Sequence, residues 1–84
     1  MMTAKHPKSA SLMRISAAAE AAGVSKQTLE YYIMLGMVTP RRIDGKKGRF
    51  FDPLLVKRIK LIRELNQSGY TLRAIREIYL KRTP

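Results

Sequence analysis

Apolar positions in the first half of the chain follow two short helical patterns separated by a tight turn. The first pattern predicts a helix that Ser16 caps and that ends near Ala22, because Gly23 readily takes up a left-handed backbone. The second predicts a helix over residues 26–35 that Ser25 caps. The expected inner faces are Ala18, Ala21 and Ala22 in the first helix, and Leu29, Tyr32 and Ile33 in the second. A helix, a turn and a second helix with a polar start are typical of a helix-turn-helix.

Between residues 37 and 51 the pattern changes to two short extended runs on either side of a turn. The runs are 38–43 and 49–51, and the turn between them, 44–48, contains two glycines and two lysines. We predict a small two-stranded β hairpin with a cationic tip, a wing, and the alternative is an irregular solvated loop. Since side chains alternate along a strand, one of Phe50 and Phe51 should lie in the core and the other should be partly exposed.

The last third of the chain predicts two more helices. Asp52 and Pro53 form a strong helix start, an acidic N-cap followed by proline at the first helical position, and this helix should end at Gly69. Thr71 caps a last helix that runs to about Arg82. The expected inner residues are Leu55, Val56, Ile59, Ile62 and Leu65 in the third helix; Leu72, Ile75, Ile78 and Tyr79 in the fourth should face the core or a partner. The predicted fold is mostly α, a winged helix-turn-helix of four helices with one β hairpin between helices two and three.

A chain of 84 residues is expected to form one small domain, here over residues 13–82. Residues 1–12 are polar and basic without periodicity, which predicts a disordered leader. Translation could begin at Met1, Met2 or Met13, where the ordered pattern opens. Because we find neither a signal peptide nor an apolar run long enough to span a bilayer, we expect a cytoplasmic location, in association with the nucleoid.

The net charge of +11 points to a polyanionic partner, and the pI is about 10.6. Nine of the cations fall between residues 41 and 63, beside the helix-turn-helix rather than in a tail. We therefore interpret the charge as a nucleic-acid surface rather than as a solvated face. The chain has no cysteine and a single histidine, so we expect no metal or other cofactor, and the residues for an enzyme's active site are missing.

A helix-turn-helix places its second helix in the DNA major groove. There Gln27 suits adenine and Lys26 suits guanine, while cations of the wing would meet phosphates. The candidate DNA-binding residues are Ser25, Lys26, Gln27, Thr28, Glu30, Tyr31, Arg41, Arg42, Lys46, Lys47, Arg49, Tyr70 and Arg73.

An ordered set of short motifs carries a resemblance to a known family. The motifs are Ala22-Gly23-Val24-Ser25, Thr28-Leu29-Glu30-Tyr31-Tyr32, Gly48-Arg49-Phe50-Phe51-Asp52 and Gly69-Tyr70-Thr71-Leu72. Together they resemble the winged-helix DNA-binding domain of the MerR family of bacterial transcription regulators. The resemblance implies promoter binding as a dimer and distortion of the DNA. It also implies that Tyr31 contacts phosphate, that Arg49 grips the DNA backbone, and that the turn between the last two helices does the same.

The sequence departs from the family pattern at two places. Glu30 stands where members commonly carry arginine, and it would either accept a hydrogen bond from cytosine or pair with Lys26 one helical turn away. The residues given end at Pro84, so the long dimerisation helix and the effector domain are not expected to carry over, and neither is ligand sensing.

The function predicted from sequence is sequence-specific regulation of transcription through double-stranded DNA. Because one small domain reads few base pairs, we expect self-association, as a dimer or as an oligomer assembled on DNA. RNA polymerase at the promoter is a candidate further partner. The alternatives are an architectural, excisionase-like factor that bends DNA and a basic module that binds an acidic protein.

Overall fold

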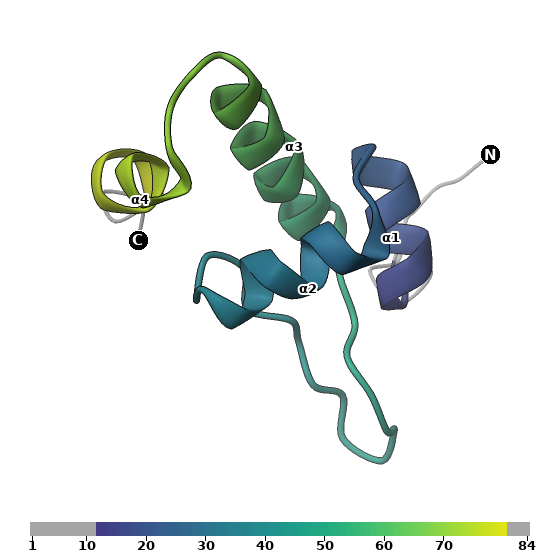
Figure 1. The fold of residues 1–84 in the computed structure, drawn as a ribbon. Helices are drawn as coiled ribbons and strands as arrows, with labels where there is room; N and C mark the ends of the chain where they lie inside the picture. The colour runs from purple at the N-terminus through teal and green to yellow at the C-terminus, as the bar shows by residue number, and fades with distance from the viewer. Residues whose placement is uncertain (1–11, 81–84) are drawn as a thin grey trace, which may run out of the picture.

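The structure is a computed structural model that describes residues 12–80, and it is mostly helical, as predicted. The helices are α1 (Ile15–Ala22), α2 (Lys26–Met34), α3 (Pro53–Gln67) and α4 (Leu72–Ala74), which continues directly into the π-helical segment η2 (Ile75–Leu80). Figure 1 shows α1 and α2 beside the first part of α3; after the other end of α3 the chain turns back, so that α4 lies to its side. The long loop between α2 and α3 extends away from the helices.

Three of the four helices begin at the side-chain caps that the sequence predicts. Ser25, Asp52 and Thr71 each accept a hydrogen bond from the backbone N–H three residues on, at 2.9–3.0 Å. Gly23 ends α1 with φ at 77°, a left-handed conformation that costs glycine little. Residues 1–11 of the predicted leader and the predicted end of the last helix at Arg82 lie outside the described residues.

The predicted cap at Ser16 is wrong, because the cap position is two residues earlier, at Arg14, which makes no side-chain hydrogen bond to the helix. The physical reason lies just upstream. Met13 and Phe51 exchange two backbone hydrogen bonds, of 2.9 and 2.8 Å. This antiparallel bridge fixes the backbone two residues before the first residue of α1. Tertiary pairing therefore sets the start of α1, not a capping side chain.

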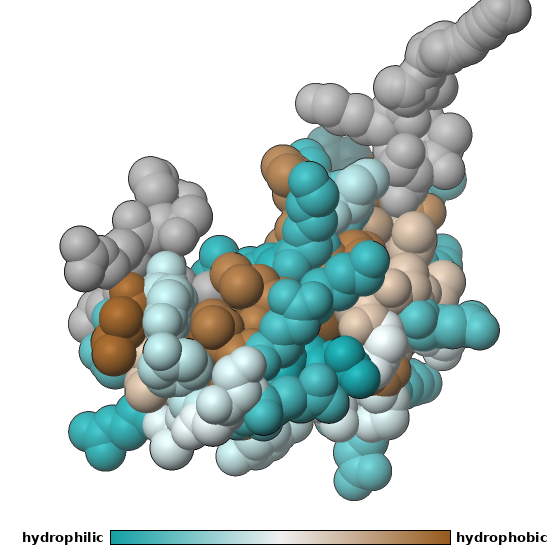
Figure 2. Space-filling view, turned by 90° about the horizontal axis from the view of Figure 1, so that it is seen from above, coloured by the Kyte–Doolittle hydropathy of each residue, from teal (hydrophilic) through white to brown (hydrophobic). Residues whose placement is uncertain are grey.

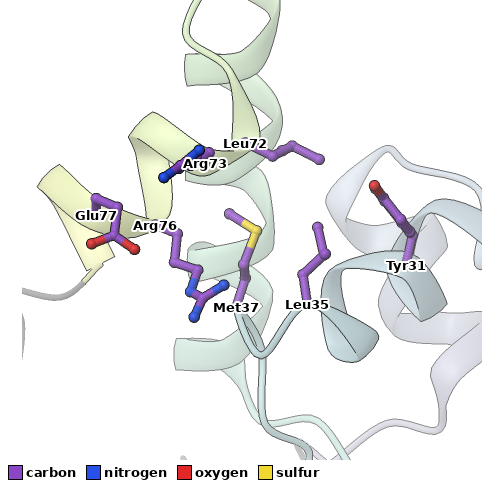
Figure 3. Close-up of a pocket in the computed structure, with 7 residues that line it drawn as sticks. All are labelled: Tyr31, Leu35, Met37, Leu72, Arg73, Arg76 and Glu77. Atoms are coloured by element: carbon purple, nitrogen blue, oxygen red, sulfur yellow. The ribbon is translucent and has the colours of Figure 1, made fainter.

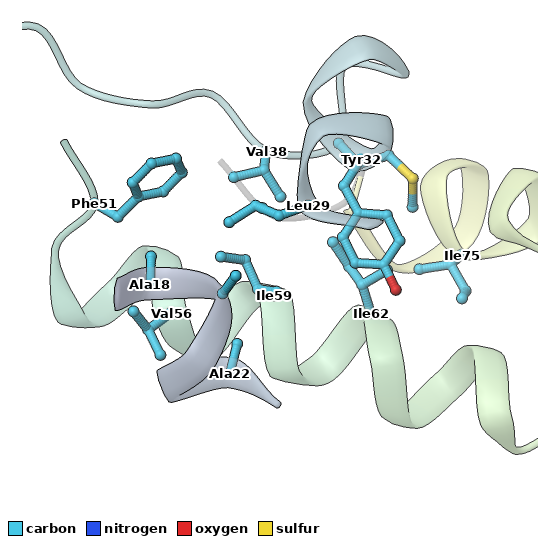
Figure 4. Close-up of a cluster of buried hydrophobic side chains, with 12 residues drawn as sticks. Ala18, Ala22, Leu29, Tyr32, Val38, Phe51, Val56, Ile59, Ile62 and Ile75 are labelled. Carbon is cyan, nitrogen blue, oxygen red and sulfur yellow. The ribbon is translucent and has the colours of Figure 1, made fainter. Parts of the chain in front are cut away.

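One apolar core joins the three longer helices and the start of η2. Its largest fully buried side chains are Phe51, Leu29, Met37, Ile59, Ile62, Ile75 and Val38. Figure 4 shows Leu29, Val38 and Ile59 close together between α2 and α3, with Ala18 and Ala22 of α1 beside α3. On α1 the buried residues are Ala18, Ala19 and Ala22, so the predicted inner position of Ala21 is wrong. The shift follows from α1 packing against both α2 and α3.

The loop between α2 and α3 lacks the regular strands predicted for it. We call residues 39–50 of this loop the wing loop. Within it, Arg41 and Phe50 exchange two backbone hydrogen bonds in a single antiparallel bridge. Pro40 has no N–H to extend the pairing toward the helices, and toward the tip the Lys46 N–H turns back to the Ile43 carbonyl. The predicted two-stranded hairpin is therefore not confirmed, although the segment does project as one arm (Figure 1).

The structure also corrects the expectation that one of the two phenylalanines is partly exposed. Phe51 is fully buried, and Phe50 is buried as well. The guanidinium of Arg14 lies over the Phe50 ring, 4.6 Å from its centroid, and shields it from water. Within residues 12–80, no helix has the length and apolar character needed to cross a membrane.

Candidate nucleic-acid interface

The outer face of α2 is polar and open at its start. Leu29 and Tyr32 are buried and anchor the helix to the core, as the spacing predicts. Lys26, Gln27 and Tyr31 lie on the exposed side, and 47% of Tyr31 is accessible. The helix therefore presents a lysine, a glutamine and a phenol in its first two turns.

Ser25 and Thr28 have a local structural role at the start of α2. The Ser25 Oγ accepts from the Thr28 N–H at 3.0 Å and donates to the Thr28 Oγ1 at 2.9 Å. These bonds satisfy helix N–H and hydroxyl groups that would otherwise need water. A contact from either residue to DNA stays a prediction.

Glu30 and Arg49 form a bidentate ion pair between α2 and the wing loop. Arg49 Nη1 and Nη2 donate to Glu30 Oε1 and Oε2, each at 2.9 Å. The hydrogen bonds from Arg49 hold the pKa of Glu30 below its usual value, and those from Glu30 raise the pKa of Arg49. The expected partner within the helix, Lys26, has only a minor electrostatic effect on Glu30. Sequence reasoning missed the pair because 19 residues separate its members.

Arg14 also holds the wing loop, and no sequence pattern singled it out. Besides covering Phe50, its Nη1 donates to the Lys47 carbonyl at 3.0 Å. The loop's own Arg42 donates to the Gly48 carbonyl at 3.5 Å. The Lys46 and Lys47 side chains remain exposed near the tip, where the sequence places the cationic end of the arm.

At the base of the wing loop, Arg41 is engaged in an internal ion pair. Its Nη1 lies 2.9 Å from Oδ2 of Asp52, the residue that caps α3. Burial alone would raise the pKa of Asp52, but hydrogen bonds from the Leu55 N–H and from Arg41 lower it. The pair ties the loop to the start of α3.

On the other side of α2, a groove of about 420 Å³ separates it from the last helical segments. Figure 3 shows Leu35, Met37 and Leu72 in its middle, Tyr31 on the α2 side, and Arg73 and Arg76 on the other. A neighbouring hollow lies between Gln27 and Asn66. Tyr70 is exposed in the turn before α4, and its ring meets the Tyr79 ring edge-on at 5.5 Å.

The outer face of α2 thus lies between two cationic elements. One is the wing loop, joined to it through Glu30, and the other is the segment of α4 and η2, with Arg73 and Arg76 across the groove. Figure 2, a view of another side, shows apolar side chains in separate groups divided by polar ones. The surface around the outer face of α2 is therefore mainly polar and cationic.

The fold and this surface define a small helix-turn-helix domain with a cationic arm. The family model for the MerR HTH family of regulatory proteins matches residues 13–81, and the chain belongs to that family.

Two curated relatives share this region. The chain is 32% identical over 62 residues to the mercuric resistance operon regulatory protein of Bacillus cereus. The aligned region covers 74% of this chain and 47% of that protein. It is 36% identical over 64 residues to the HTH-type transcriptional regulator CueR of Bacillus subtilis, covering 76% and 44%. The chain spans about half the length of these relatives.

Proposed function

We propose that this domain binds double-stranded DNA in a sequence-specific way and regulates transcription. The observation that carries the proposal is the exposed start of α2 between two cationic elements, in a chain with a net charge of +11. The names of the two relatives, a regulatory protein and a transcriptional regulator, support the same function.

Base recognition is assigned to Lys26 and Gln27, which lie exposed in the first turn of α2. Glutamine forms two hydrogen bonds with adenine and lysine donates to guanine, each pairing discriminating by about 1–3 kcal/mol when the geometry is good. Tyr31, exposed beside the groove, would contact a sugar or donate to a phosphate.

Phosphate binding is assigned to the cations on either side. Lys46, Lys47 and Arg42 would act from the wing loop, Tyr70 from the turn before α4 and Arg73 from α4. These contacts fix the orientation of the domain on the duplex, and the binding constant should fall steeply with salt.

The test is selection of bound fragments from a genomic DNA pool by the purified protein at near-physiological salt. A recovered motif that disappears in Lys26→Ala/Gln27→Ala supports specific recognition through α2. Tight binding without a motif, together with a measured bend, would identify an architectural factor instead. Absence of binding to any duplex would overturn the proposal and favour an acidic protein partner.

The salt dependence of binding distinguishes the residues assigned to phosphate from those assigned to bases. Lys47→Gln should weaken binding to all sequences and make the slope of log K against log salt less steep by about 0.9. Lys57→Gln removes the same charge from the exposed, outer side of α3 and serves as the control. An equal loss in both variants would contradict the assignment of the wing loop.

We further propose that more than one copy binds, because one domain reads too few base pairs for genomic discrimination. Assembly on DNA at adjacent sites is preferred over pairing of the last helices, since a short helix supports only a weak interface. Sedimentation velocity with and without duplex DNA tests this. A tight dimer in the absence of DNA would contradict it. We also propose that the protein regulates transcription at the promoter, where RNA polymerase would be a further partner.

A further inference from the structure

We propose that Glu30 is a positioning residue: it withholds Arg49 from DNA phosphate and fixes the wing loop at one angle to the recognition helix α2. The inference rests on the proposed DNA-binding function and changes the role of one residue within it. Arg49 then supports the structure of the site and does not itself contact DNA.

The geometry of the pair is the first argument. Both terminal nitrogens of Arg49 are committed to both carboxylate oxygens of Glu30 at 2.9 Å. An arginine bound in this fork-to-fork manner presents to a phosphate only its Nε and the outer N–H bonds, and it carries a compensating negative charge beside it. The pair as a whole is neutral, so it adds no attraction for the polyanion.

The second argument is what the pair connects. Glu30 lies in the middle of α2, and Arg49 lies next to Phe50 at the base of the wing loop. The loop has only one backbone bridge of its own, so side chains must set its direction. Arg14 holds it from the other side through the Lys47 carbonyl and the Phe50 ring. The ion pair with Glu30 fixes the position of the loop relative to α2, the helix proposed to read bases.

The consequence is a trade between non-specific affinity and discrimination. A free Arg49 would bind phosphate of any sequence, whereas a fixed arm allows its other cations to reach phosphates only when α2 sits at one register in the groove. Glu30 also repels phosphate directly if it loses its partner, which penalises binding modes that break the pair.

The experiment measures binding of a fluorescein-labelled duplex of unrelated sequence, by anisotropy, across a fourfold range of salt. The central variant is E30Q/R49Q, which keeps the net charge of the wild type because one charge of each sign is lost. We expect its affinity and salt slope to equal those of the wild type within twofold. If Arg49 contacts phosphate in the wild type, the double variant will instead lose a slope of about 0.9, as Lys47→Gln does, and that result overturns the proposal.

The single variant Glu30→Gln gives the opposite signature. It releases Arg49 and removes a repelling carboxylate, so binding to the unrelated duplex should tighten and the salt slope should steepen by about 0.9. An unchanged slope would overturn the idea that Glu30 withholds the arginine. The ratio of affinities for a selected motif and the unrelated duplex should fall severalfold in both Glu30→Gln and the double variant.

A readout without DNA keeps the positioning role testable by itself. Backbone ¹⁵N relaxation of Lys46 and Lys47 should show greater mobility in E30Q/R49Q, with the amides of α3 unchanged as an internal check on folding. Equal mobility in the two proteins would overturn the positioning role. If the wild type binds no duplex while the loop still loosens in the variant, the proposed function fails and the positioning of the loop stands.

Discussion

The helices and the wing loop of this domain are held by different forces. Around Ile59, which is completely buried, the helices meet through apolar side chains from α1, α2, α3 and η2. The wing loop has one backbone bridge and the buried Phe50 at its base, and arginines attach the rest of it, through Arg14, Arg41 and Arg49. Apolar burial is insensitive to pH and is weakened little by salt, whereas the Arg41–Asp52 and Arg49–Glu30 ion pairs are partly exposed and respond to both.

The difference bears on function because the two regions have different tasks. The helical part must keep the start of α2 at a fixed place, for which a close-packed core is suited. In the proposed function the wing loop must hold one direction while its lysines stay at the surface, and polar attachments remain compatible with solvent there. Perturbations should therefore separate into those that unfold the domain and those that release the arm alone.

The largest expected effect comes from the core. Ile59→Ala should lower the free energy of unfolding by about 2–5 kcal/mol, because it removes buried methyl groups and leaves a cavity. Urea unfolding followed by circular dichroism measures it. Leu54→Ala, at a position 74% exposed on the same helix, is the control and should change stability by less than about 0.5 kcal/mol. Similar losses in the two variants would show that α3 is not packed as described.

A smaller loss is expected where the loop joins the helices. Asp52 caps α3 and pairs with Arg41, so Asp52→Ala should cost about 1–2 kcal/mol, most of it from the cap. Asp52→Asn keeps a capping oxygen and loses only the ion pair, and it should cost less than half as much. Thermal unfolding of both variants tests this. If Asp52→Asn is as destabilising as Asp52→Ala, the ion pair with Arg41 contributes more than the cap. The start of α3 would then depend on polar attachments, as the wing loop does.

Much of the helical part was predictable from the sequence, because each signal is local. The caps at Ser25, Asp52 and Thr71 and the turn at Gly23 lie where residue type predicts them. The start of α1 was missed because the bridge from Met13 to Phe51 decides it, and that bridge joins residues far apart in the chain.

The candidate site was predictable in composition but not in its internal pairing. The exposed Lys26, Gln27 and Tyr31 follow from helical spacing. The partner of Glu30 does not, since a carboxylate on a helix surface is expected to pair locally and the bidentate partner comes from a loop with no periodicity. Arg14 carried no sequence signal for the same reason: its two contacts depend on where the loop returns.

A third prediction compares two glycines of the wing loop. Gly45 and Gly48 have positive φ angles of 80° and 102°, so alanine strains the backbone at either position. Only at Gly48 would the new Cβ also meet Arg14, 2.5 Å from its Nη1, whereas nothing lies within 4 Å at Gly45. Gly48→Ala should therefore be more destabilising than Gly45→Ala by about 0.5–1 kcal/mol, the value of the displaced cation–π contact. Thermal unfolding gives the difference, and equal effects would mean that Arg14 is no attachment of the arm.

The smallest and most selective effect should come from acid. The pKa values of Glu30 and Asp52 are lowered in the folded protein, so the stabilisation they provide is present above the unfolded-state values of about 4 and is lost as the pH falls through the folded-state values. The free energy of unfolding should decline as the pH falls from about 5 through the folded-state pKa values, and the wing loop should loosen before the core unfolds. Urea midpoints across this range, with amide exchange of Lys46 and Lys47 beside that of Ile59, separate the two regions. The variant E30Q/D52N lacks both carboxylates and should show a flatter pH dependence. A pH dependence as steep as that of the wild type would place the acid sensitivity elsewhere and would remove the distinction between a polar arm and an apolar core.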